Sequence, residues 1–176
     1  MNTAVLSRKI ILNENIEKAI WVSFFVLATT FGAQVKIPLP FTPVPLTLQT
    51  FFVLLSGAML GKKFGTISQM IYLLLGGVGL PLFTQTGALL GPTGGYIAGF
   101  VYASWFVGFA IEKKWSLFLA LLVGDLILLS FGVVNLSFFV GGIKKAVMLG
   151  MLPFLAGDIL KIFAVLGVIK ISGVKR

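Results

Sequence analysis

The sequence contains no cysteine and no histidine among its 176 residues. Disulfides, thiol nucleophiles and the imidazole or thiolate ligands of zinc and haem sites are therefore absent. The Ser-His and Cys-His catalytic pairs are excluded for the same reason. We accordingly expect neither an enzyme nor a metal or cofactor bound by the chain itself.

Charge is also scarce. Only 11% of the residues are charged and 58% are hydrophobic, whereas a soluble domain has roughly 25% charged residues. So much apolar surface requires lipid as its solvent. The apolar residues form long runs and do not alternate as they do in barrel strands. The sequence therefore predicts an all-α integral membrane protein.

We expect six membrane-spanning helices in a single transmembrane domain that covers residues 1–176. Their predicted bounds are Ile16–Val35, Leu46–Leu60, Phe64–Gly79, Gly94–Ile111, Trp115–Val134 and Met148–Ile169. Several are near the lower limit of about 17–25 residues for a spanning helix. The stretch Leu136–Ala146 is predicted to be either a surface helix or an extension of the fifth span.

The basic residues mark the ends of apolar segments and form no single patch, which argues against a nucleic-acid partner. If both termini are cytoplasmic, ten of the 14 basic residues lie inside. The external ones are then Lys36, Lys144 and Lys145, and Lys161 lies within a span. This bias predicts a multi-pass protein of the plasma membrane with cytoplasmic termini. The sequence offers no explanation for the external Lys144-Lys145 doublet.

Two predicted outer segments, Lys36–Pro45 and Val78–Gly95, are rich in proline, glycine and threonine. The first has four prolines in ten residues and cannot form a helix. We expect both segments to be irregular. Irregular backbone at membrane depth is tolerated only where it is buried in protein or lines a cavity. We therefore expect an extracellular loop cap over a pocket that opens outward.

Three ionisable residues, Asp125, Asp158 and Lys161, lie inside apolar runs. Each would cost roughly 2.5–3.5 kcal/mol if it faced lipid. Asp158 and Lys161 are at i and i+3, on one face of a helix. They are either an ion pair that fixes helix packing or the polar end of a ligand pocket. We favour the pocket, because apolar residues serve a purely structural role better. For Asp125, packing and function are equally open.

Neutral polar residues near the predicted outer face are the remaining ligand-binding candidates. Gln49 lies near the start of the second span, and Thr84 lies in the second outer segment. Thr93 and Gly94 open the fourth span, where backbone N–H groups can approach a ligand. The surrounding glycines lack the GxxxxGK[ST] pattern, so we expect no ATP site in this chain.

Pairs of small residues four positions apart allow helices to approach closely. They include Gly57/Gly61 and Gly95/Gly99, which we interpret as packing within the chain. Ala28/Gly32 and Thr29/Ala33 in the first helix are the candidates for docking a partner.

A set of short motifs points to a known family. In chain order they are Ile37–Pro40, Pro43–Gln49, Tyr72–Gly76, Gly79–Pro81, Gly91–Tyr96 and Gly157-Asp158-x-x-Lys161. Their order and spacing resemble BioY, the biotin-specific S components of energy-coupling-factor (ECF) transporters. Each motif alone is weak, but the set is specific and spans most of the chain.

The resemblance implies a six-helix S-component fold that binds biotin beneath a loop lid near the outer surface. It also implies a transmembrane coupling subunit, docked at Ala28 and Gly32, and cytoplasmic ATPases that drive import. The family's polar site corresponds to Asp158 and Lys161. We hypothesise that Asp158 accepts a ureido N–H, that Lys161 donates to the ligand, and that Tyr96 walls the ring.

The sequence also leaves two other classes of membrane protein to consider. A self-sufficient transporter of biotin or another small molecule would need a coupling-ion path, which Asp125 and Asp158 could supply. An intramembrane aspartyl protease would need two complete aspartate motifs. The contexts Val123-Gly124-Asp125 and Ala156-Gly157-Asp158 match neither of them.

Overall fold

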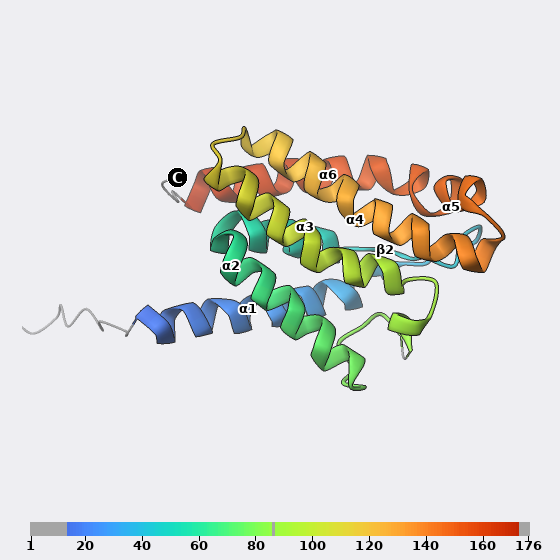
Figure 1. The fold of residues 1–176 in the computed structure, drawn as a ribbon, viewed down its shortest axis with the longest axis horizontal. Helices are drawn as coiled ribbons and strands as arrows, with labels where there is room; N and C mark the ends of the chain where they lie inside the picture. Colours follow the sequence, from blue (N-terminus) through green and yellow to red (C-terminus); the bar gives the residue numbers. More distant parts are fainter. Residues whose placement is uncertain (1–13, 86, 173–176) are drawn as a thin grey trace, which may run out of the picture.

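The computed structural model describes residues 14–85 and 87–172 as a bundle of helices (Figure 1). The elements are α1 (Glu14–Gln34), β1 (Lys36–Ile37), β2 (Leu46–Thr47), α2 (Gln49–Gly77), η1 (Ala88–Leu90), α3 (Gly94–Glu112), α4 (Leu117–Val140), α5 (Ile143–Gly150) and α6 (Leu152–Ser172). Helices α1, α3, α4 and α6 are each long and apolar enough to cross a membrane. The predicted all-α membrane fold is confirmed.

Helix α2 is a hairpin of two arms. At Gly61 the backbone is left-handed (φ 72°, ψ −179°), a conformation that glycine adopts without a steric cost. The arms then run back along each other, since Gln69 Nε2 donates to Ser56 Oγ at 3.1 Å and Gln49 Nε2 donates to Tyr72 O–H at 2.6 Å. These arms correspond to the predicted second and third spans, but among the described residues only four helices are long and apolar enough to cross a membrane, so the count of six spans is approached and not reached.

Both arms of α2 are short. They have roughly 12 and 16 residues, or about 18 and 24 Å of helix, against a hydrocarbon core of about 30 Å. The turn between them is fixed near the C-terminal end of α3, where Lys62 Nζ lies 2.8 Å from Glu112 Oε2. The first arm, measured from this turn, therefore does not reach the opposite membrane face. It starts at Gln49, and the space between Gln49 and that face is available for a cavity and its cover.

The first outer segment is more ordered than we expected. Lys36 pairs with Thr47 and Ile37 with Leu46 in a two-stranded antiparallel ribbon. The paired residues lie just outside the four prolines, which occupy the loop between the strands and cannot donate to a ladder. The second outer segment likewise contains the short helix η1. The expectation of wholly irregular outer loops is therefore wrong.

The structure also refines the predicted bounds of the fifth and sixth spans. Helix α4 continues to Val140, as the predicted extension of the fifth span requires, and Gly141 caps it in the left-handed region. The separate helix α5 follows, so α6 begins at Leu152. The predicted start of the sixth span at Met148 is wrong. The apolar residues of α5 run into those of α6, and hydropathy does not reveal the break between them.

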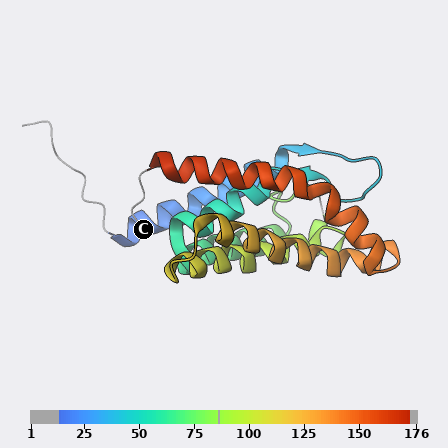
Figure 2. The same ribbon diagram turned by 90° about the horizontal axis from the view of Figure 1, so that it is seen from above.

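The two ends of the bundle carry different charges. Helix α1 begins and α6 ends at one end, together with the turn between α3 and α4, whereas the β1–β2 loop and α5 lie at the other (Figures 1 and 2). Lys113 and Lys114 belong to the first end, and Lys36, Lys144 and Lys145 to the second. The fold thus separates the charges as the orientation prediction requires. Arg8, Lys9, Thr86, Lys175 and Arg176 lie outside the described residues.

Small residues pack the helices against one another. A Cβ atom on Gly57 would lie 2.4 Å from Ser104 O in α3, and one on Gly95 would lie 2.3 Å from Phe131 O in α4. Packing within the chain is therefore confirmed for these positions.

The small residues of α1 also face inward. Ala28 is buried, and a Cβ atom on Gly32 would lie 3.0 Å from the backbone of Gln49. Thr29 and Ala33 are fully buried. The exposed face of α1 instead carries large apolar residues, among them Phe24 and Leu27. This placement gives Ala28 and Gly32 a role in internal packing and does not support a partner contact through them.

Candidate functional site

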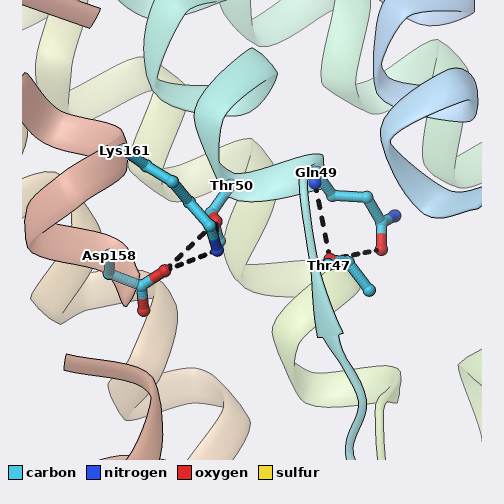
Figure 3. A network of polar contacts seen from close by, with 5 residues as sticks. All are labelled: Thr47, Gln49, Thr50, Asp158 and Lys161. Carbon is cyan, nitrogen blue, oxygen red and sulfur yellow. Dashed lines mark hydrogen bonds and ion pairs between the residues drawn. The ribbon is translucent and has the colours of Figure 1, made fainter. Parts of the chain in front are cut away.

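A buried polar cluster joins the start of α2 to α6 (Figure 3). Lys161 Nζ lies 2.8 Å from Asp158 Oδ1 and donates to Thr50 Oγ1 at 2.7 Å. Thr50 Oγ1 in turn donates to Asp158 Oδ1 at 3.3 Å. The side chains of Lys161 and Asp158 are only 12% and 3% exposed. The i, i+3 pairing predicted from sequence is present, and a threonine 108 residues away completes it.

The cluster still has a hydrogen-bond acceptor and a hydrogen-bond donor to offer a ligand. The hydrogen bonds and the ion pair of Asp158 all use Oδ1, which leaves Oδ2 as an acceptor. Lys161 uses two of its three donors. A ligand in contact with the cluster can therefore both donate to the carboxylate and accept from the ammonium group.

The cluster forms one wall of a small, partly open cavity of about 50 Å³, below the roughly 300–1,000 Å³ of typical small-molecule pockets. The lining residues are Val44, Pro45, Thr47, Gln49, Thr50, Thr84, Thr93, Tyr96, Ile97, Phe100, Leu128, Leu129, Phe154, Asp158 and Lys161. They come from the β1–β2 segment, the second outer segment and helices α2, α3, α4 and α6, so the fold assembles the cavity from nearly its whole length.

Six of the seven ligand-binding candidates line this cavity, namely Asp158, Lys161, Gln49, Thr93, Tyr96 and Thr84. Gly94 does not. A Cβ atom on Gly94 would lie 2.0 Å from Leu89 O, so the glycine is needed for the close approach of η1 to α3. Its expected place beside the ligand stays a prediction.

Gln49 is held in a chain of hydrogen bonds. Thr47 Oγ1 donates to Gln49 Oε1 at 3.2 Å, and Gln49 Nε2 donates to Tyr72 O–H at 2.6 Å. Tyr72 O–H donates to Leu82 O at 3.0 Å, which ties the site to the second outer segment. The network orients the amide, and a buried, satisfied network of this kind favours one arrangement of the cavity wall.

Thr93 and Tyr96 line the cavity, but their hydroxyl groups already donate to backbone carbonyls. Thr93 Oγ1 donates to Ala88 O at 3.1 Å, and Tyr96 O–H donates to Gly150 O at 2.6 Å. Their polar atoms therefore fix η1 and the end of α5. The Tyr96 ring, together with Phe100 and Phe154, gives the cavity an aromatic side suited to an apolar ring.

Sequence reasoning missed Thr50 and Tyr72. Thr50 follows Gln49 directly, but nothing in its neighbourhood indicates a contact with α6. Tyr72 belongs to one of the family motifs, but its role in orienting Gln49 depends on the fold of α2 back on itself. Both contacts join residues that are distant in sequence, so no local pattern could have shown them.

Asp125 on α4 lies close enough to Asp158 and Lys161 to interact with them electrostatically. It is 2% exposed, and its Oδ1 has no hydrogen-bond partner among the described residues. The interior of the bundle thus contains two carboxyl groups and one ammonium group in one region. A buried, unpaired carboxylate is far costlier than a neutral polar group of the same shape.

Replacement of Asp125 by asparagine should therefore leave the protein at least as stable. We expect an increase of about 1 kcal/mol in the free energy of unfolding, or a rise of roughly 2–4 °C in Tm. Thermal unfolding of the purified protein in detergent, followed by tryptophan fluorescence, measures this. A fall in Tm would instead favour the packing role, with Asp125 as a charge partner of Lys161.

A family model described as the BioY family matches residues 2–175. The chain belongs to the BioY family. It is 45% identical over 145 residues to "Biotin transporter BioY" of Thermotoga maritima, covering 78% of this chain and 85% of the relative. It is 43% identical over 144 residues to "Probable biotin transporter BioY" of Pyrococcus horikoshii, covering 80% and 86% of the two chains.

Two further comparisons cover nearly the whole of this BioY family member. "Biotin transporter BioY" of Lactococcus lactis is 30% identical over 179 residues, with 92% of this chain and 94% of the relative aligned. The crystal structure of an S-component for biotin from an ECF-type ABC transporter superposes with a TM-score of 0.85, at 24% identity, covering 93% of this chain and 94% of the other. The chain thus has the S-component fold, and it is a multi-pass membrane protein.

Proposed function

We propose that this chain is the membrane-embedded biotin-binding subunit of a vitamin uptake transporter and captures biotin from outside the cell. One observation carries the proposal: the buried pair of Asp158 and Lys161, bridged by Thr50, lines a cavity beneath the outer loops. Membership of the BioY family, whose relatives are named biotin transporters, supports biotin as the ligand.

Biotin matches the chemistry of this cavity. Its ureido ring has two N–H donors and one carbonyl acceptor, and its bicycle is apolar. In this proposal Asp158 Oδ2 accepts a ureido N–H, and Lys161 has a donor left for the ureido carbonyl. The aromatic and aliphatic side chains of α3, α4 and α6 that line the cavity would cover the bicycle. The ureido ring would thus form hydrogen bonds with Asp158 and with Lys161 at the same time. Hydrogen bonds of this kind are strong because one partner is charged.

Import requires energy from partner subunits in this proposal. The sequence has no phosphate-binding loop, so ATP would be hydrolysed by cytoplasmic ATPases coupled through a transmembrane subunit. The solved structure that shares the fold is described as an S-component from an ECF-type ABC transporter. Uptake into proteoliposomes with and without these partners separates this arrangement from self-sufficient transport.

The proposal predicts a selective binding profile. The purified protein in detergent should bind biotin, and dethiobiotin, which keeps the ureido ring, more weakly. Thiamine and riboflavin should bind at least about 100-fold more weakly than biotin, since they leave the buried polar groups unpaired. Isothermal titration calorimetry against all four ligands measures this. Comparable affinity for thiamine or riboflavin would disprove biotin capture as the function.

A further inference from the structure

A second groove lies beside the mouth of the cavity, between the two outer loops. Its lining residues are Lys36, Pro38, Leu39, Thr42, Pro43, Pro45, Thr84 and Gln85. Pro45 and Thr84 also line the main cavity. The two spaces therefore adjoin, and a ligand longer than the cavity would extend toward the groove.

Lys36 is the cation of this groove. Its Nζ donates to Thr84 O at 2.6 Å, so the ammonium group lies next to a residue that lines both spaces. The lysine is exposed and keeps two further N–H donors. No acidic residue is found among the described residues that line the groove, so no carboxylate in its wall neutralises this charge.

The charges along the path from mouth to deep end determine which way a ligand enters. At the deep end Lys161 is paired with Asp158, and the buried Asp125 is near both. That region has no uncompensated positive charge for an anion. At the mouth Lys36 is available. An elongated ligand with a neutral polar ring and an anionic tail is therefore favoured with its ring inward and its tail at Lys36.

We propose that Lys36 binds the carboxylate of the ligand's tail at the mouth and makes the site selective for acids over their uncharged derivatives. The proposal rests on biotin capture as the function, because biotin has such a tail. The Thr84 contact and the carboxylate use different donors of one ammonium group. Binding of the acid therefore leaves the link between the two outer loops intact.

Biotin and biotinamide test this, since they share the ring and the length of the tail and differ in charge. The full-length protein in detergent should bind biotin roughly three- to five-fold more tightly than biotinamide, the range expected for a solvent-exposed ion pair. The Lys36→Met variant should bind both ligands equally. Lys145→Met, which removes another exposed lysine at the same end of the bundle, is the matched control and should keep the preference.

The ratio of the affinities for biotin and biotinamide reports only on the charge of the ligand's carboxylate. If Lys36→Met also loosens the outer loops, both ligands lose affinity together and the ratio still reports on the carboxylate. The preference in the unmodified protein should shrink as NaCl is raised from about 0.05 to 0.5 M, because salt screens exposed pairs. An unchanged ratio in Lys36→Met, or no preference in the unmodified protein, would overturn the proposal. Failure of the unmodified protein to bind either ligand would refute biotin capture itself.

Discussion

Replacing Asp158 with asparagine should reduce biotin affinity by at least roughly 100-fold, because two hydrogen bonds to charged groups are affected at about 1.5–3 kcal/mol each. The carboxylate that would accept the ureido N–H is gone, and Lys161 loses its ion-pair partner at 2.8 Å. The variant should also be less stable by about 3–5 kcal/mol, as expected when one member of a buried pair is removed. Titration calorimetry gives the affinity and thermal unfolding gives the stability.

The double variant Asp158→Asn/Lys161→Met separates ligand binding from packing. It removes both charges of the pair together, so its Tm should recover most of what either single variant loses. Biotin binding should not recover, because neither charged partner remains. If the double variant regained both stability and affinity, the pair would serve only to hold α6 against α2. If Asp158→Asn and Lys161→Ala each bound biotin normally, the assignment of the site would be wrong.

The polar end of the site could be predicted because charged residues are rare inside membrane-spanning segments and stand out in the sequence. Only three ionisable residues lie inside apolar runs, and the helical spacing of Asp158 and Lys161 places them together. Thr50 carries no such signal, since a threonine is tolerated in a membrane helix for many reasons. Its contact with α6 exists only because the first arm of α2 is short and starts beside the pair.

The fold was predictable where hydropathy and charge agree. It was less predictable where the backbone conformation of a single residue sets the course of the chain. The six spans follow from apolar runs separated by basic residues. The turn at Gly61 depends on a left-handed conformation at one residue, and the break between α5 and α6 has no polar marker. The short strands that flank the prolines depend on tertiary position more than on composition. Gly94 was assigned to the ligand because sequence shows that a glycine allows close approach but not what approaches.

Replacing Gly108 with alanine should be strongly disruptive although this residue lies outside the site. A Cβ atom there would lie 2.1 Å from Lys62 N and 2.4 Å from Gly61 C, so it would meet backbone at the turn between the arms of α2. No side-chain rotation relieves such a contact, and we expect a loss of about 3 kcal/mol, the upper part of the usual range for overpacking. Tm should fall by roughly 6–12 °C.

Gly167→Ala is the matched control, since Gly167 lies in the membrane helix α6 with nothing within 4 Å of its would-be Cβ atom. Its Tm should be unchanged or slightly higher, because alanine is the better helix former. The turn at Gly61 anchors the arm that begins with Gln49 and Thr50, so Gly108→Ala should also weaken biotin binding although it lies far from the cavity. Equal Tm values for the two glycine variants would mean that α3 and the α2 turn do not touch. A lower Tm with unchanged biotin affinity would mean that the arm keeps its position without this contact.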